Sequence, residues 1–343
     1  MPKYNQAALE TLLSGIASQY LSREVVLVWF SRSHFSSLAC FRLVDQATKP
    51  GVVVKTIMPW YLDQLDTVQR GEVAKLWIEA TMHFRNLLTQ HGVPVAKDYR
   101  CFCQDGYVYH LSSEEGRSGE EFVQSLSPVA RAQAIRLILE AITGVLRQQN
   151  SPLVGLDPQL SNFGFRQTPL GLKVSYLDVF PPLCWFQGRY LVHYPNPTDS
   201  GIIESELNRK FRLLGILRRM RFSIMAIDLG LEEIFFNELS AVLGNSLLAE
   251  TMGFFNSLPD ASVKNSFDHA AVKDSILRLQ PDGQGIDAIR EFGVRLASRY
   301  TERSRTDFLA DVFDLSRKDQ SPGFEEPHLV RFEKLQKRLV SLL

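Results

Sequence analysis

The sequence has no excess of charge of either sign, with 38 basic and 38 acidic side chains among 343 residues. A chain without a basic surplus lacks the electrostatic footprint typical of nucleic-acid-binding proteins. It has no apolar run near the roughly 20 residues that a membrane-spanning helix needs, and its first residues lack the apolar core of a signal peptide. These absences predict a cytoplasmic protein with no membrane span and no nucleic-acid partner.

Cysteine is also scarce, and its four copies show no spacing typical of a zinc site. Free thiols are expected in a reducing compartment. The histidines are scattered, and His83 and His91 do not have the spacing of a zinc-binding pair on one helix. No Gly-x-Ser-x-Gly elbow, Walker A loop or Rossmann glycine pattern occurs, so none of these signatures identifies an activity. The four cysteines are Cys40, Cys101, Cys103 and Cys184.

The first third of the chain is rich in strand patterns. Asp105-Gly106 is the strongest short signal for a β-hairpin, and it separates two β-rich runs. Between the third and fourth predicted strands, apolar residues recur at helical spacing from about Thr67 to Gln90, and Gly92 is a natural residue to follow that helix. The five predicted strands span 24–30, 39–44, 52–57, 99–104 and 107–111.

The rest of the chain is dominated by helical patterns, and its length favours a second domain. Ser127-Pro128 supplies an N-cap and a proline at N1 for a helix that runs to about Asn150. The basic run 209–222 predicts a helix with one solvated face or, alternatively, a contact for an anionic substrate or a membrane surface. The predicted divisions are an N-terminal helix at 1–22, a strand-rich lobe at 23–111, a polar hinge at 112–119 and a helical lobe at 120–343.

The stretch 154-VGLDPQLSNFGF-165 contains Asp157 and Asn162, separated by four residues and followed by two predicted short strands that lead to Asp178. A second copy of the same spacing, 260-DASVKN-265, precedes a helical pattern instead, so the spacing alone decides nothing. One interpretation is an ordinary hairpin in which Asp and Asn form the turns. The other is a phosphoryl-transfer loop, because carboxylate and amide oxygens suit Mg²⁺.

The order of these elements resembles the protein-kinase-like fold. It runs through five strands with a helix after the third, a hinge, a helix, this loop and a hairpin ending in Asp178. Three motifs carry the resemblance: VVVKTI at 52–57, EATMHFRNLLTQHGVPVA at 79–96, and DPQLSNFGF at 157–165 with the YLDVF that follows. They look closest to the small-molecule branch typified by aminoglycoside and choline phosphotransferases. The resemblance implies an α+β, bilobal fold, with a small antiparallel five-stranded N-lobe carrying one helix and a large, mostly helical C-lobe.

The resemblance gives a role to one lysine and one glutamate of the strand-rich lobe. Lys55, on the third strand, would neutralise the α- and β-phosphates of ATP. Glu79 would pair with Lys55 and fix its position, but Glu72 lies two helical turns earlier on nearly the same face and is a rival. The alternative for each is an ordinary solvated side chain on a strand or a helix.

The loop and the hairpin would carry the rest of the site. Asp157 would act as the catalytic base or orient the acceptor hydroxyl, and Asn162 and Asp178 would hold Mg²⁺ against the phosphates. Asp178 follows an apolar strand and precedes the apolar Phe180. We therefore expect its carboxylate in a partly buried cleft, where it needs a partner or a metal.

Three features depart from the family pattern. Gly155 stands two residues before the loop aspartate, where a structural histidine is common. The loop that should cover the phosphates, 31-SRSHFSSL-38, has no glycine, although glycine lets backbone amides approach phosphates closely. The hydroxyls of Ser33 and Ser36 would take over that contact. No Ala-Pro-Glu-like segment follows the hairpin, which favours a small-molecule acceptor over a protein.

Three functions are compatible with these residues. The first is an ATP- and Mg²⁺-dependent phosphotransferase acting on a small-molecule hydroxyl or amine, by in-line transfer that depends on positioning and charge neutralisation. The second is a pseudokinase, a binding or scaffold module that keeps the fold, which Gly155 and the glycine-free loop motivate. The third is nucleotidyl transfer from the same site. The sequence leaves the acceptor and the oligomeric state open.

Overall fold

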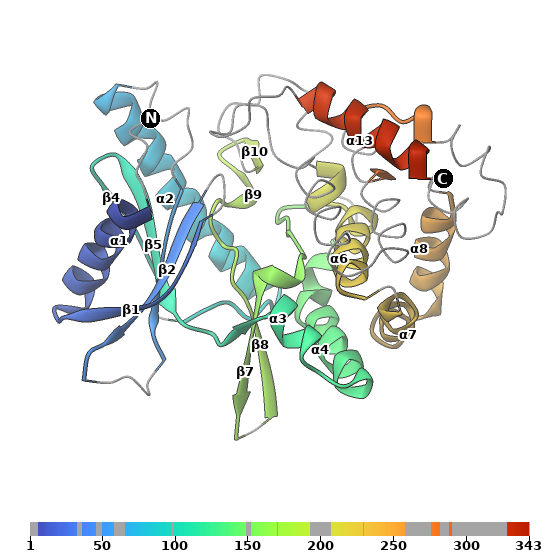
Figure 1. Cartoon of the computed structure of the whole chain (residues 1–343), viewed down its shortest axis with the longest axis horizontal. Helices are drawn as coiled ribbons and strands as arrows, with labels where there is room; N and C mark the ends of the chain where they lie inside the picture. Colours follow the sequence, from blue (N-terminus) through green and yellow to red (C-terminus); the bar gives the residue numbers. More distant parts are fainter. Residues whose placement is uncertain are drawn as a thin grey trace. The chain divides into compact units, whose positions relative to one another are not determined.

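The structure of the chain is a computed structural model, drawn in Figure 1 with its elements coloured along the sequence. The chain divides into two compact units: unit 1 comprises Met1–Gly119 and Asn162–Pro195, and unit 2 comprises Glu120–Ser161 and Asn196–Leu343. Among the described residues, no helix is long and apolar enough to cross a membrane. The structure describes residues 6–32, 36–45, 50–57, 66–97, 99–148, 152–169, 171–192, 207–228, 230–257, 276–281, 288–289 and 328–342.

Unit 1 is built around a five-stranded antiparallel sheet. Its strands are β1 (Val25–Arg32), β2 (Ser36–Leu43), β3 (Val52–Ile57), β4 (Arg100–Gln104) and β5 (Tyr107–Ser113). They lie in the order β1-β2-β3-β5-β4, and the helix α2 (Thr67–Gln90) follows β3. Asp105 and Gly106 take positive φ angles of 53° and 79° in the β4–β5 turn, as a tight hairpin turn requires. The predicted α+β class, with five antiparallel strands and one helix after the third, is confirmed.

The helix α1 (Gln6–Leu21) covers one face of this sheet. Leu13 and Ile16 of α1 are buried with Phe41 and Val54 of the sheet in one apolar cluster. Because side chains alternate along a strand, the residue after Val54 points to the opposite face. That residue is Lys55, so the sheet directs it away from the α1 cluster.

The helix α2 packs against the other face of the five-stranded sheet. The residues at its two ends are typical of helix termini. The Asp66 side chain accepts a hydrogen bond from the Gln69 backbone N–H, and the Gln69 side chain accepts one from the Asp66 N–H. This capping box satisfies amides that the first turn leaves unpaired. Just past the C-cap, Gly92 has a φ of 76°, which glycine adopts without penalty. Trp77 of α2 meets Phe180 edge-on, with the ring centroids 5.4 Å apart.

The segment Asn162–Pro195 contributes two further β-structures to unit 1. One is the predicted hairpin of β7 (Phe163–Thr168) and β8 (Gly171–Tyr176), to which β6 (Arg117–Ser118) adds a third strand. The other is a hairpin of β9 (Leu183–Phe186) and β10 (Arg189–Val192). We predicted mostly helix after Asp178, which was wrong for this stretch. Gln187 and Gly188 both take positive φ angles there, and so form a tight turn that brings the two runs together.

The polar stretch 112–119 is integrated into this β-structure. It contains the end of β5 and both residues of β6, and Glu115 within it is only 4% exposed. The predicted division assigned every residue from 120 onward to the helical lobe, whereas Asn162–Pro195 belongs to unit 1. Pairing between β6 and β7 is one physical reason for that grouping.

The part of unit 2 that the structure describes is mostly helical. The predicted start at Ser127-Pro128 matches the observed start of α4 at Pro128. The basic run 209–222 does not form a solvated face, because Arg218, Arg219 and Arg221 are all buried. Arg221 donates through Nε to Glu232 at 2.8 Å, so a buried charge is compensated by a neighbouring helix. Among the described residues, the helices after β6 are α3 (Gly119–Gln124), α4 (Pro128–Leu146), α6 (Leu213–Ile227), α7 (Leu231–Leu243), α8 (Asn245–Ser257) and α13 (His328–Leu342), and η2 (Leu160–Asn162) is a single 3₁₀ turn.

Candidate functional site

Lys55 of β3 and Asp178, just after β8, meet within unit 1. The Lys55 Nζ donates to Asp178 Oδ1 at 2.5 Å, and the two side chains are only 12% and 13% exposed. Two opposite charges that are this deeply buried are stable only if they pair with each other or with another charged group. The structure thus brings together the predicted phosphate-binding lysine and the predicted metal-binding aspartate.

Asn162 lies at the base of the hairpin that leads to Asp178. It ends η2, and its backbone oxygen accepts a hydrogen bond from the Leu177 N–H at 2.8 Å. This bond continues the β7–β8 ladder by one position beyond the pair formed by Phe163 and Tyr176. Asn162 therefore lies beside the residue that precedes Asp178, and both predicted metal ligands belong to one hairpin of unit 1.

Asp178 and Asn162 carry side chains of the kind that can hold Mg²⁺ together with phosphates. Among the described residues, no group of three His, Cys, Asp or Glu side chains could hold a metal ion. Mg²⁺ is commonly bound through one or two carboxylates, with substrate phosphates and water completing the octahedron. Asp178 and Asn162 offer a carboxylate and an amide oxygen, which fit that incomplete protein contribution.

Glu79, predicted to pair with Lys55, is exposed on α2, and the ion pair of Lys55 is to Asp178. The buried stripe of α2 includes Trp77, and Glu79 follows two residues later, about 200° around the helix axis. Glu72 is exposed as well and lies on nearly the same side as Glu79. The packing of the helix therefore turns both predicted partners away from the sheet.

Asp157 is held by an arginine that the sequence did not connect with it. Arg219 of α6 donates through Nη2 to both Asp157 oxygens at 2.9 Å and through Nε to Oδ1 at 3.2 Å. Both residues belong to unit 2, and their side chains are 7% and 8% exposed. A second polar neighbour, Gln159 Nε2, lies 3.5 Å from Oδ2. Asp157 thus forms a buried, bidentate ion pair within unit 2.

Gly155, one of the departures from the family pattern, has a packing reason in this chain. A Cβ atom at this position would lie 2.7 Å from Cε2 of Phe211, a fully buried ring. Leu156, the next residue, donates its N–H to the Lys210 oxygen at 2.7 Å, which draws the loop against the segment containing Phe211. The ring therefore fills the space that a histidine side chain would need.

His110 is a buried group near the site that sequence analysis missed. It lies opposite Lys55 in the β3–β5 ladder, and neither ring nitrogen has a hydrogen-bond partner among the described residues. Burial, followed by the nearby charges of Lys55 and Arg85, lowers the pKa of His110 to about 3. The imidazole is therefore neutral at physiological pH, so it adds no positive charge beside Lys55. Only its place in the β3–β5 pairing could have suggested this role.

The predicted phosphate-covering loop is described only in part. Ser33 lies outside the described residues. Ser36 is the first residue of β2 and pairs with Ile57 on β3. Its predicted contact with a nucleotide stays a prediction.

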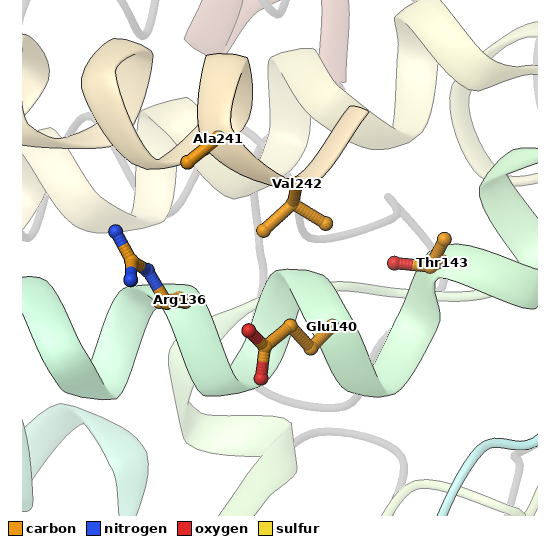
Figure 2. A pocket seen from close by; sticks show the side chains of 5 residues that line it. All are labelled: Arg136, Glu140, Thr143, Ala241 and Val242. Atoms are coloured by element: carbon orange, nitrogen blue, oxygen red, sulfur yellow. The ribbon is translucent and has the colours of Figure 1, made fainter. Parts of the chain in front are cut away.

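A hollow in unit 2 lies between α4 and α7 (Figure 2). Arg136 and Glu140 come from α4, across from Ala241 and Val242 of α7, and the Arg136 charge is paired with Glu238. None of the predicted site residues lines this hollow. The full lining is Arg136, Glu140, Thr143, Ala241 and Val242.

Comparisons with known proteins do not assign the chain to a family. No family model matches it, and no curated protein matches it. Among solved structures it is similar to the MAP kinase LmaMPK10 from Leishmania major, at 12% identity over 98% of this chain and 99% of that chain, with a TM-score of 0.38. A likeness at this level carries no argument about activity. The chemistry of the site is therefore inferred from the residues of this chain.

Proposed function

We propose that the chain is an ATP- and Mg²⁺-dependent phosphotransferase that acts on a small-molecule hydroxyl or amine. The observation that supports this most is the contact of Lys55 with Asp178, a cation on the third strand and a carboxylate after the hairpin, at 2.5 Å. In phosphoryl transfer a lysine neutralises phosphate charge and an aspartate holds the metal. Nucleotide binding would separate the pair, because Lys55 would move to the phosphates and Asp178 to the metal.

Asp178 and Asn162 would hold the Mg²⁺, with phosphate oxygens and water as its other ligands. When bound, the ion would offset the negative charge that develops on the transferred phosphoryl group. The protein's own part is to hold Asp178 against Lys55, on a hairpin whose register brings Asn162 beside Leu177. The absence of an Ala-Pro-Glu-like segment after the hairpin supports a small acceptor.

A second candidate function is a nucleotide-binding or scaffold module of the same fold without catalysis. The bidentate pair of Asp157 with Arg219 favours it, because both oxygens of the carboxylate that would serve as base already accept hydrogen bonds from Arg219. The exposed position of Glu79 adds to this, since Lys55 then lacks the glutamate that the resemblance supplies. The two candidates differ in whether a phosphoryl group leaves the nucleotide.

Titration calorimetry with ATP, in Mg²⁺ and in EDTA, tests binding at the proposed site. We expect Mg²⁺-dependent binding by the wild type, loss of binding in Lys55→Met, and unchanged binding in Lys75→Met, a control at an exposed lysine of α2. Equal affinity in all three proteins would contradict the site.

Formation of ADP in the presence of pooled small hydroxyl and amine compounds then separates the two functions. The phosphotransferase predicts acceptor-dependent ADP that Asp157→Asn abolishes. The scaffold predicts binding without ADP formation, equally in the wild type and the variant.

A further inference from the structure

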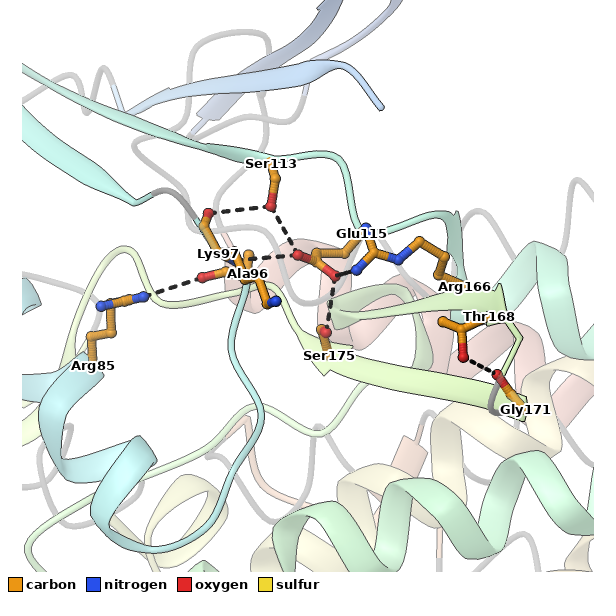
Figure 3. A network of polar contacts seen from close by, with 9 residues as sticks. All are labelled: Arg85, Ala96, Lys97, Ser113, Glu115, Arg166, Thr168, Gly171 and Ser175. Atoms are coloured by element: carbon orange, nitrogen blue, oxygen red, sulfur yellow. Dashed lines mark hydrogen bonds and ion pairs between the residues drawn. The ribbon is translucent and has the colours of Figure 1, made fainter. Parts of the chain in front are cut away.

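Glu115 is a buried carboxylate whose four polar contacts come from the end of β5, from Lys97 and from the β7–β8 hairpin (Figure 3). A carboxylate withdrawn from water is stable only if its oxygens accept hydrogen bonds or face a cation. Oε1 accepts from the Ser113 hydroxyl at 2.8 Å and from the Lys97 backbone N–H at 3.2 Å. Oε2 accepts from the Ser175 hydroxyl at 3.2 Å and lies 3.3 Å from Arg166 Nη2.

The two carboxylate oxygens of Glu115 contact different parts of unit 1. The partners of Oε1 are Ser113, at the end of β5, and Lys97, in the connection from α2 to β4. The partners of Oε2 lie on the three-stranded sheet, with Arg166 on β7 and Ser175 on β8. Glu115 therefore joins the sheet that carries Lys55 to the hairpin that leads to Asp178.

The backbone around Glu115 fits closely against the same hairpin. Gly116 has a φ of 92°, and a Cβ there would lie 2.1 Å from the Phe165 oxygen of β7. A Cβ on Gly164 would lie 2.9 Å from the backbone oxygen of Glu115. Both glycines thus allow the two backbones to approach closely.

The metal ligands proposed above lie a short way along the chain from the anchored residues. Ser175 precedes Asp178 by three residues, and Arg166 follows Asn162 by four. Between Ser175 and Asp178, the Tyr176 N–H donates to the Pro94 oxygen at 2.7 Å. We infer that Glu115 is a positioning residue that sets Asn162 and Asp178 relative to Lys55. This inference rests on the proposed function.

Such a residue matters because metal and phosphate sites tolerate little displacement. A misplacement of about 1 Å is enough to impair a catalytic site. Partners outside the first ring of metal ligands commonly contribute about 10- to 100-fold to metal affinity. Loss of Glu115 should therefore weaken the Mg²⁺-dependent part of nucleotide binding and leave the contact of Lys55 with phosphate in place.

The neighbouring Glu114 provides a matched control. It is a partly buried carboxylate paired with Arg42 at 3.0 Å, and it accepts from the Gly51 N–H at 2.8 Å. Arg42 lies on β2 and Gly51 directly precedes β3, so neither of these partners belongs to the β7–β8 hairpin. Glu115→Gln and Glu114→Gln thus remove the same charge one residue apart, and only the first weakens the tie to the hairpin.

Two measurements on the full-length variants test the inference. In hydrogen exchange, we expect the amides of Tyr176 and Leu177 to exchange about tenfold faster in Glu115→Gln than in the wild type or Glu114→Gln. In ATP titrations, we expect the ratio of the Kd in EDTA to the Kd in Mg²⁺ to fall about tenfold in Glu115→Gln only, with the Kd in EDTA unchanged. Ser175→Ala, which removes one hydroxyl, replaces Glu115→Gln if that variant does not fold.

Unchanged protection of Tyr176 and Leu177 in Glu115→Gln would overturn the inference. So would faster exchange of these amides with no change in the Mg²⁺ ratio, because Glu115 would then be only structural. If the wild type binds no ATP, the proposed function fails, and the exchange experiment decides separately whether Glu115 holds the hairpin.

Discussion

Arg219 binds both carboxylate oxygens of Asp157, with its Nη2 2.9 Å from each. Paired, charge-assisted hydrogen bonds of this kind are among the strongest in proteins. They commit the lone pairs that a catalytic base would offer to a substrate proton. Catalysis by Asp157 therefore requires Arg219 to move or to act with it, and this pair is the feature that best separates the two candidate functions.

Removing Arg219 should destabilise the protein far more than removing an exposed arginine. Arg219→Leu leaves the Asp157 charge buried without its partner, and we expect a loss of about 3 to 5 kcal/mol in the free energy of unfolding. The control is Arg136→Leu, whose side chain is 49% exposed in its pair with Glu238; it should cost less than about 1 kcal/mol. Urea denaturation measures both, and equal losses would contradict the buried pair.

Lys55 and Asp178 should show strong coupling in a double-mutant cycle. Lys55→Met and Asp178→Asn each leave one partner unpaired in a site only 12–13% exposed. Each should therefore cost about 1 to 3 kcal/mol, since an unsatisfied buried group carries such a penalty. The double variant removes both charges, so its loss should be clearly smaller than the sum of the two. Additive losses in urea denaturation would mean that the contact contributes nothing.

His110 should make the protein less stable at mildly acidic pH. Its folded-state pKa of about 3 lies below the ordinary value of 6.5, so below pH 6.5 the unfolded chain takes up a proton that the folded protein does not. Stability therefore falls as the pH falls from about 6.5 toward 3, by on the order of 2 kcal/mol at pH 5. Denaturation curves at pH 7 and pH 5 should show this loss in the wild type.

His110→Leu removes the group and is the control for this pH dependence. The variant should lose about 2 kcal/mol less than the wild type between pH 7 and pH 5. Identical losses in both proteins would show that His110 does not carry the effect.

One added methyl group at Gly155 should destabilise the protein. In Gly155→Ala the new Cβ would lie 2.7 Å from the Phe211 ring, and overpacking of this kind costs about 1 to 3 kcal/mol. Gly71→Ala in α2 is the control, because nothing lies within 4 Å of a Cβ there; it should stabilise by about 0.5 to 1 kcal/mol. Thermal denaturation compares them, and Phe211→Leu should partly rescue Gly155→Ala. A neutral Gly155→Ala would contradict the packing argument.

The elements that the sequence predicted well depend on local patterns. The helix α2 begins at Thr67 and ends at Gln90 as predicted, because its apolar spacing and its C-terminal glycine are read within the segment itself. The β4–β5 hairpin follows from Asp105-Gly106 in the same way. Such signals involve residues that are neighbours in the chain, so one sequence is enough to detect them.

The features that were missed depend on partners far apart in the chain. Arg219 stands 62 residues after Asp157, and nothing in a basic helical run says which arginine will turn inward. Glu115 was assigned to a polar hinge because its partners Arg166 and Ser175 come from a hairpin that follows much later in the chain. Glu79 was assigned by resemblance, and the packing of Trp77 decided its direction instead.

Whether Lys55 and Asp178 mark a Mg²⁺-nucleotide site can be decided by the melting temperature of the protein with and without Mg²⁺-ATP. Nucleotide at a hundredfold over its Kd should add about 2.7 kcal/mol to the free energy of unfolding. We predict a Mg²⁺-dependent rise in the wild-type melting temperature that is lost in Asp178→Asn. No rise at millimolar Mg²⁺-ATP, or the same rise in Asp178→Asn, would rule out the proposed nucleotide site.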